Sequence, residues 1–435
     1  MNVAQYIYRM LVSRTGDEAD NGLDRSVAQA QARNFLTHVT SLSATKSADG
    51  LIDPKLVLSW LLTSLGAPSF LTGMLVPVRE AGALLPQLFT AAWIARMNQR
   101  KWAWAAGSFV QGIAAASIGA CALFLDGQVA GYAILALLAV LALSRSICSV
   151  SYKDVLGRTL LKKTRGTATG TASSISAGIV IAFGLLLTSG LAERKSLVIG
   201  GLFVAAALWL TGATLFTRLA EEKGATEHSG DTLSAAIGNI SLLWKDRQFG
   251  RFVLTRSLLI STALAPPYMV MLSTAAGGGD GRSGYGELGL LVIASATATL
   301  LSGYVWGRLS DRSSRKVLFY SALAASVTLV LTIAAAWFGL IRLPLVLPAL
   351  VFGLMIAYQG VRIGRSTHLV DMAGDSDRAA YTAVSNTVIG VLLLLVGAFG
   401  AIASIAGAEA VLGLFAVMAL CAMFAAHGLE EVQQD

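Results

Sequence analysis

Seven charged residues of this sequence stand within or beside long apolar runs, where they could bind a proton or an ion. They are Lys46, Asp49, Asp53, Arg79, Glu80, Arg145 and Arg256. Lys46, Asp49 and Asp53 follow the spacing i, i+3, i+7, which places them on one face of a helix. A carboxylate kept away from water takes up a proton closer to neutral pH, and basic side chains can orient an anion. The pattern therefore indicates proton and solute binding.

The composition indicates which elements carry these residues. Of the 435 residues, 55% are hydrophobic and only 13% are charged, about half the charged fraction of soluble domains. So few charges exclude a disordered chain, a nucleic-acid-binding domain and a large soluble enzyme. The three cysteines and four histidines have no metal-ligand spacing, and we expect no metal and no cofactor. The sequence predicts an all-α membrane protein.

Ten apolar runs are long enough to span a bilayer, which takes about 20 residues of helix. They cover residues 102–125, 130–150, 168–190, 197–217, 251–274, 286–306, 317–339, 343–363, 380–405 and 409–427. Residues 34–96 allow two interpretations. Hydropathy alone places one helix over 56–78, whereas a turn at 65–69 would separate helices at 36–63 and 70–96. Matching basic pairs at 100–101 and 315–316 indicate an internal repeat, which favours the turn. We therefore predict twelve spans in two halves of six.

The predicted spans set the depth of the charged residues. Asp53 and the pair Arg79 and Glu80 each lie about ten residues from the outer end of their span, or ~15 Å at 1.5 Å per residue. They should meet near the middle of the membrane, where an unpaired charge costs about 2.5 to 3.5 kcal/mol. We hypothesise that one of the three carboxylates takes up a coupling proton, while the basic residues orient the solute. The alternative is that the charges are structural ion pairs between the first, second and fourth spans.

Lysine and arginine predict the orientation, because short cytoplasmic loops are rich in both. The loops on one side of the predicted spans carry twenty Lys and Arg, against five on the other side. Both termini are therefore predicted to be cytoplasmic. We expect cytosolic tails at 1–33 and 428–435, bundles at 34–217 and 251–427, and a linker at 218–250. An amphipathic linker helix would present Leu233, Ile237, Ile240 and Leu243 on one face.

A motif rich in basic residues follows the eighth predicted span. It reads Gly307-Arg308-Leu309-Ser310-Asp311-Arg312-Ser313-Ser314-Arg315-Lys316. Glycine permits a tight turn, Asp311 can cap the next helix or accept from an arginine, and basic residues fit a cytoplasmic loop. The motif resembles the signature of the major facilitator superfamily, Gly-x-Leu-x-Asp-Arg-x-x-Arg-Arg/Lys, between helices 8 and 9. The alternative is a basic turn that only sets the topology.

The resemblance covers residues 36–427 and implies two six-helix bundles with a cytoplasmic latch between them. The residues of this gating motif would be Gly307, Asp311, Arg312, Arg315 and Lys316, with Arg158 and Arg365 in the facing loops. We hypothesise that Asp311 pairs with Arg365. Arg145 resembles the buried arginine of helix 4 in proton-linked members, although Ser149 stands where those members usually have glycine. In the first half, Arg96 takes the place of the aspartate.

Together these features predict a secondary transporter that moves a small anionic or zwitterionic solute by alternating access, coupled to protons. We expect a monomer in the bacterial inner membrane with no nucleic-acid partner. A rival hypothesis is a transporter-like sensor or assembly factor that binds a ligand or a protein without transport. The charged stripe in the first span favours transport. An enzyme is not expected, because the loops hold no Ser/His/Asp, metal or phosphate-binding pattern. Pro266 and Pro267 should kink the seventh span.

Overall fold

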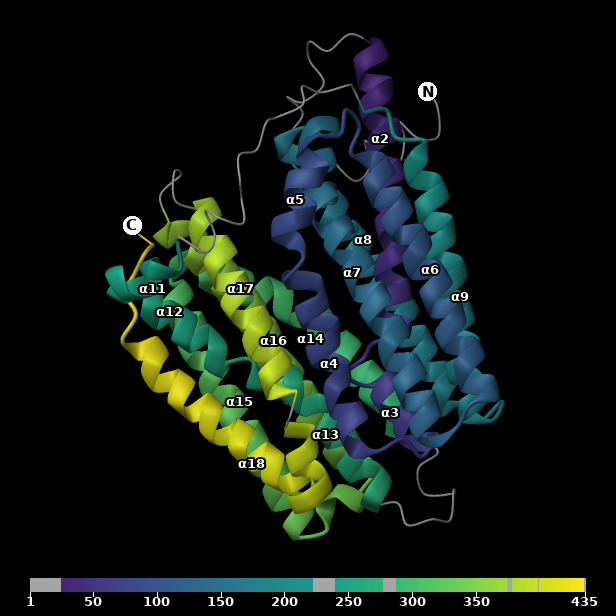
Figure 1. The fold of residues 1–435 in the computed structure, drawn as a ribbon, viewed down its shortest axis with the longest axis vertical. Helices are drawn as coiled ribbons and strands as arrows, with labels where there is room; N and C mark the ends of the chain where they lie inside the picture. The colour runs from purple at the N-terminus through teal and green to yellow at the C-terminus, as the bar shows by residue number, and fades with distance from the viewer. Residues whose placement is uncertain (1–24, 222–238, 277–286, 374–377, 398, 434–435) are drawn as a thin grey trace.

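The computed structural model describes residues 25–221, 239–276, 287–373, 378–397 and 399–433, and every regular element in these ranges is a helix. The first half of the chain contains α2 (Arg25–Leu51), α3 (Val57–Ser64), α4 (Ser69–Leu84), α5 (Gln87–Ala95), α6 (Lys101–Phe124), α7 (Gly127–Thr159), α8 (Lys162–Thr188) and α9 (Arg194–Thr217). Here α2 packs against α8 and α9, α6 packs against α7 and α9, and α4 packs against α7. These helices form one group, purple to teal in Figure 1.

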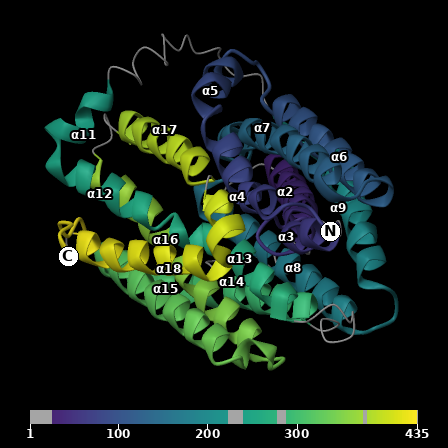
Figure 2. The ribbon, with the colours of Figure 1, turned by 60° about the horizontal axis from the view of Figure 1, so that its bottom comes forward.

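The second half begins with two short elements and continues with long helices. It contains η3 (Asn239–Ser241), α11 (Leu242–Lys245), α12 (Arg247–Leu258), α13 (Ser261–Ala276), α14 (Glu287–Arg312), α15 (Ser314–Trp337), η4 (Leu340–Arg342), α16 (Val346–Met372), α17 (Arg378–Val396) and α18 (Phe399–His427). Both α14 and α15 pack against α16, and α18 packs against α12, α13 and α15. Figures 1 and 2 show these helices as a second group beside the first.

Nine helical stretches among the described residues are long and apolar enough to cross a membrane. They are α6 to α9, α14 to α16, α18, and α12 together with α13. The apolar helix α17 is shorter, and the first two predicted spans coincide with the helix pairs α2 and α3, and α4 and α5, which carry charges. The helical membrane fold is confirmed, and the count of twelve spans stays a prediction.

The first two predicted spans are separated as the turn interpretation requires. Helix α3 ends at Ser64 and α4 begins at Ser69, so a single helix over 56–78 is excluded. Gly66 in the turn has a φ of 74°, which glycine adopts without strain. Helix α2 starts at Arg25, within the predicted tail, and stops at Leu51 just before Pro54, which has no N–H to continue the helix.

The seventh predicted span is broken, but ahead of its two prolines. Helices α12 and α13 are separated at residues 259–260, and Pro266 and Pro267 lie inside α13. Proline has no N–H to donate to the carbonyl four residues earlier, so Pro266 and Pro267 leave the carbonyls of Thr262 and Ala263 without this bond. Both carbonyls lie inside α13, after the break. At the break itself, the side chain of Thr262 donates to the carbonyl of Leu259 at 2.8 Å.

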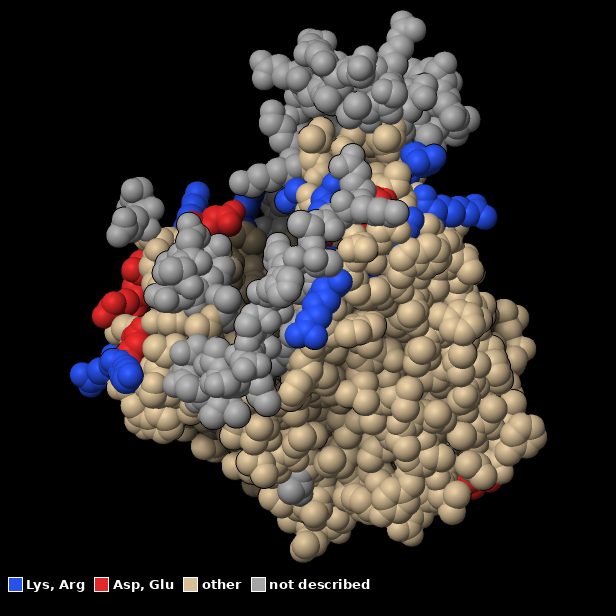
Figure 3. Space-filling model, turned by 45° about the horizontal axis from the view of Figure 1, so that its top comes forward, with Lys and Arg blue, Asp and Glu red and all other residues tan. Residues whose placement is uncertain are grey.

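The predicted linker helix lies largely outside the described residues. Leu233 and Ile237 are not in the described ranges, whereas Ile240 is in η3 and Leu243 is in α11. The neighbouring Trp244 is 78% exposed. Figure 3 shows lysine and arginine gathered around the end where α2 begins, while the broad surface below is almost free of charge. Such a surface matches the acyl chains of a bilayer.

The two halves touch most closely at the end away from the start of α2 (Figure 1). There α8 contacts α14, and α4 contacts α18. A Cβ atom at Gly289 would lie 2.5 Å from the carbonyl oxygen of Gly184, and one at Gly400 would lie 2.8 Å from the Cα of Phe70. Backbones approach this closely only where small residues leave room. Glycine therefore closes this end of the molecule, which we call the glycine contact.

Glu221, which follows α9, caps the start of α6. Its carboxylate accepts hydrogen bonds from the backbone N–H of Arg100 at 3.0 Å and of Lys101 at 2.8 Å. We expect Glu221→Gln to lower stability by about 1 kcal/mol, because the amide keeps only one acceptor oxygen. The control is Glu193→Gln, since Glu193 precedes α9 without a side-chain cap. Thermal unfolding in detergent should give a lower Tm for Glu221→Gln only, and equal Tm values would contradict the expectation.

Candidate functional site

Asp49 is the centre of an ion-pair cluster between three helices of the first half. Its carboxylate on α2 accepts from the guanidinium of Arg79 on α4 at 2.6 Å and from that of Arg145 on α7. The Arg79 side chain is 9% exposed, so its charge has little access to water. The structure thus brings the first, second and fourth predicted spans together through charges, as the structural alternative proposed. Asp49, rather than Asp53, receives Arg79.

Asp53 and Lys55 flank the proline that follows α2. The Asp53 carboxylate accepts from the backbone N–H of Lys55 at 3.0 Å. The Lys55 ammonium extends to the second half, where it lies 3.7 Å from the centre of the Tyr358 ring on α16. A cation over an aromatic face is attracted by the ring quadrupole. The break in the first helix therefore supplies a charged contact between the two halves.

A cavity of about 320 Å³ lies between the two halves and contains most of the predicted site. The first half contributes Lys46, Asp49, Asp53, Lys55, Arg145, Ser173 and Ser176, and the second half contributes Ser295, Thr299, Tyr358, Gln359 and Arg362. Within it the Lys46 ammonium donates to the hydroxyl of Ser173 at 2.5 Å. We call this space the main cavity. Its walls combine charged groups with hydroxyls, as a site for a polar solute requires.

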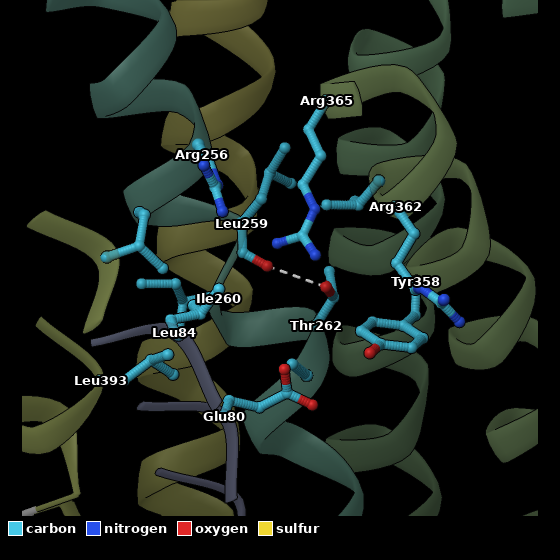
Figure 4. A pocket seen from close by; sticks show the side chains of 13 residues that line it. Glu80, Leu84, Arg256, Leu259, Ile260, Thr262, Tyr358, Arg362, Arg365 and Leu393 are labelled. Carbon is cyan, nitrogen blue, oxygen red and sulfur yellow. Dashed lines mark hydrogen bonds between the residues drawn. The ribbon is translucent and has the colours of Figure 1, made fainter. Parts of the chain in front are cut away.

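A smaller cavity of about 30 Å³ adjoins this region (Figure 4). It is lined by Glu80 on α4, Arg256 on α12 and Arg365 on α16, and the guanidinium of Arg362 extends past the ring of Tyr358 at its edge. Within the described part of the chain, the Glu80 carboxylate forms no hydrogen bond or ion pair. Basic groups of both halves act on its charge, Lys55 and Arg79 from the first half and Arg365 and Arg362 from the second.

Arg256 joins α12 to α17. Its guanidinium donates to the hydroxyl of Ser385 at 2.6 Å and to the side-chain oxygen of Asn386 at 2.9 Å. The Asn386 amide in turn donates to the side-chain oxygen of Gln87 in the first half at 3.4 Å. Arg256 is 7% exposed, and it therefore fixes the basic wall around Glu80 instead of moving freely.

Six basic and three acidic side chains line the two cavities. The basic residues are Lys46, Lys55, Arg145, Arg256, Arg362 and Arg365, and the acidic ones are Asp49, Asp53 and Glu80. Charges of one sign in a cleft with low-dielectric walls raise the local concentration of ions of the opposite sign. The arrangement can therefore hold a small anion in contact with both halves.

The gating motif is helical where a loop was expected. Gly307 to Arg312 complete α14, and only Ser313 interrupts the helix, accepting from the backbone N–H of Lys316 at 3.1 Å as the cap of α15. Asp311 is exposed and forms no ion pair with Arg365 in the described structure. Arg365 instead lines the cavity around Glu80, because α16 continues to Met372 and carries it on the same face as Tyr358. The expected pair is absent from this conformation.

The residues after Asp311 bind the end of the chain. Glu431 accepts from the hydroxyl of Ser313 at 2.6 Å and lies 3.6 Å from the guanidinium of Arg315. Gln433 accepts from the backbone N–H of Ser314 at 2.8 Å. Arg158, the other expected gating residue, is exposed in the last turn of α7. The motif is thus held by the residues after α18 within its own half.

Among the charged and aromatic residues that line the two cavities, Lys55, Tyr358 and Arg362 were not predicted as site residues from the sequence. Arg362 was counted among cytoplasmic loop residues because the tenth span was ended at 363, whereas α16 extends to Met372. The spacing of Tyr358, Arg362 and Arg365 is i, i+4, i+7, which places them on one helical face. Extending the helix and applying that spacing would have found them.

Comparisons with known proteins give a match for the fold. No protein-family model and no curated protein sequence matches the chain. A point mutant of the nucleoside transporter NupG superposes with a TM-score of 0.65 at 15% identity, covering 91% of this chain and 99% of NupG. Another NupG structure gives 0.65 at 13% identity over 90% and 98%. A POT family transporter in complex with a thioalcohol-conjugated peptide gives 0.65 at 10% identity over 95% and 98%.

These likenesses cover nearly the whole of each chain. The protein therefore has the major facilitator fold, as the resemblance of its motif predicted. With nine apolar helical stretches among its described residues, it is an integral membrane protein. At identities of 15% and below, the comparison establishes the fold, and function has to be argued from the site.

Proposed function

We propose that this chain is a secondary transporter that carries a small anionic solute through the main cavity by alternating access. The observation that carries the proposal is the excess of basic groups on walls supplied by both halves. A solute held by both halves gains contacts when they close around it, and this differential binding can shift the equilibrium between two conformations. The structural neighbours are a nucleoside transporter and a POT family transporter in complex with a conjugated peptide, and this supports a small organic solute.

Glu80 is our choice for the coupling carboxylate among the three acidic residues. Asp49 is held by two guanidinium groups, and Asp53 accepts from the backbone N–H of Lys55. Glu80 has no such partner among the described residues and lines a cavity with arginines of the second half (Figure 4). Protonation of Glu80 would remove the attraction between its charge and those groups. The proton would therefore weaken this contact between the halves and change the relative stability of the two conformations.

The charge asymmetry of the loops supports a cytoplasmic location for both termini, in the inner membrane of a bacterium. With that orientation the glycine contact lies on the outer side, so the cavity faces the cytoplasm. We propose that bundles at 34–217 and 251–427 tilt against each other. Asp311 on α14 and Arg365 on α16 belong to the same bundle, so their pairing stays a separate hypothesis that requires a shift between these two helices. We also propose that the protein is a monomer and that residues 218–250 link the two bundles.

A thermal-shift screen of small metabolites on the purified protein tests the proposal, because a bound ligand raises Tm by mass action. We expect the compounds that raise Tm to be anions, and Lys46→Met or Arg362→Met to reduce their affinity about tenfold or more. The control is Lys195→Met, whose ammonium lies 3.6 Å from Asp126 outside the cavities. Neutral or cationic ligands, or shifts unchanged in Lys46→Met and Arg362→Met, would contradict the proposal.

A measurement of solute flux distinguishes the proposed transporter from the rival hypothesis of a sensor or assembly factor. In proteoliposomes a transporter should exchange a labelled anion from the screen for the unlabelled compound across the bilayer. A binding protein would raise Tm with the same anion and produce no exchange above that of empty liposomes. That second result would favour the sensor.

A further inference from the structure

A separate cavity of about 160 Å³ lies inside the first half, among α2, α6, α7 and α9. It shares Lys46, Asp49 and Arg145 with the main cavity as common wall residues. We call it the side pocket. Neither the proton nor the gating hypothesis uses it. Its position behind two basic residues of the main cavity makes it a candidate for the remainder of a bound anion.

The side pocket is aromatic. Trp104, Tyr152 and Trp209 line it, and Trp104 stacks on Phe216 with 3.9 Å between ring centres. Trp104 is 3% exposed and Trp209 is fully buried, so both rings are fixed in place. Aromatic side chains interact favourably with other rings in stacked or edge-to-face geometry. The walls therefore favour a flat ring over a flexible chain.

The side chain of Gln111 is fixed in the pocket, and its oxygen can accept a hydrogen bond. Gln111, which is 2% exposed, donates its amide N–H to the carbonyl of Gly107 and to the sulfur of Cys148, both at 3.3 Å. The carbonyl needs a donor, so the amide nitrogen must face it. The side-chain oxygen of Gln111 then has no partner among the described residues, and the hydroxyl of Tyr152 has none either. A buried polar atom without a partner is costly.

We propose that the side pocket binds the ring of a monocyclic aromatic anion, whose anionic group stays on Lys46 and Arg145 and whose far edge donates an O–H or N–H to Gln111. This inference rests on the proposed function, because it names the solute class of the same site. The size agrees, since a cavity of about 150 Å³ holds one benzene ring. Such a solute satisfies the buried oxygen and leaves the charges of the main cavity in use.

Ligand titrations of the full-length protein in detergent test the proposal. The probes are 4-hydroxybenzoate, benzoate, which lacks the donor, and hexanoate, which lacks the ring. Quenching of tryptophan fluorescence reports occupancy because two tryptophans line the pocket. We expect 4-hydroxybenzoate to bind about tenfold more tightly than benzoate, and benzoate to bind more tightly than hexanoate. In Gln111→Leu the first ratio should fall to about one.

The control is Gln99→Leu, since Gln99 lies outside the pocket and donates to the carbonyl of Glu221. It should keep the tenfold ratio. If hexanoate binds as well as the aromatic anions and Gln111→Leu changes nothing, the side pocket is not a ring site, while the proposed anion transport stands. If none of the three anions binds but other anions raise Tm, the ring proposal alone fails. If no anion binds in either assay, both proposals fail.

Discussion

Asp49→Asn is expected to lower the stability of this protein by about 3 kcal/mol, the cost of leaving a buried charge without its partner. Arg79 would lose its carboxylate while remaining 9% exposed, and Arg145 would lose the same partner. The two guanidinium groups would then repel each other across α4 and α7. The lower Tm should appear in thermal unfolding in detergent, with the loss of the monodisperse chromatographic peak as the measure of unfolding.

Asp126→Asn is the control for this prediction. Asp126 lies 3.6 Å from the ammonium of Lys195, and both side chains are exposed, 78% for Asp126 and 36% for Lys195. Water can solvate both groups after the change, so it should cost well under about 1 kcal/mol. If both variants unfold at the same temperature, the Asp49 cluster does not stabilise the first half. If Asp49→Asn together with Arg79→Met recovers the Tm, the unpaired charge is the cause.

Glu80→Gln should abolish solute accumulation driven by a pH gradient while leaving binding and exchange intact. The amide has nearly the shape of the protonated acid but cannot release a proton. For one proton carried with one monovalent anion, a gradient of one pH unit supports up to about tenfold accumulation. In proteoliposomes without a membrane potential, the variant should equilibrate the solute at a ratio of about one.

Glu193→Gln provides the matched change at the beginning of α9, outside both cavities. It should accumulate the anion like the parent protein. Tenfold accumulation retained by Glu80→Gln would remove Glu80 from the coupling role and return attention to Asp53. Loss of exchange as well as accumulation would instead show that the charge of Glu80 is needed for the conformational change itself.

Sequence alone predicted the features that depend on local physics. The long apolar helices follow from their composition, whereas the turn at 65–69, which hydropathy alone would miss, was predicted from the internal repeat. The ends of the helices were harder to predict from the sequence. Arg362 and His368 are polar and look like loop residues, yet α16 continues through both. His368 is 1% exposed and forms a hydrogen bond with Ser314 on α15 at 2.8 Å, whereas Arg362 is exposed and lines the two cavities. Burial by distant segments cannot be read from a local window.

The charged cluster was predicted in membership but not in pairing. The spacing of Asp49 and Asp53 placed both on one face. In the structure Arg79 pairs with Asp49, whereas Asp53 lies beyond the end of α2 and accepts from the backbone N–H of Lys55. Contacts across the two halves, such as Lys55 with Tyr358, join residues far apart in the chain. Only the packing of the two halves determines them.

The glycine contact has a consequence for how the protein responds to its surroundings. Gly184 approaches Gly289, and Gly400 approaches Phe70, through backbone atoms without ionisable groups, so salt and pH do not act directly on these two contacts. The region around Glu80 responds to both, because it is built from charges. Under the proposed alternating access, steric fit would set the stability of the glycine contact, and salt and pH would act on the equilibrium through the charged side.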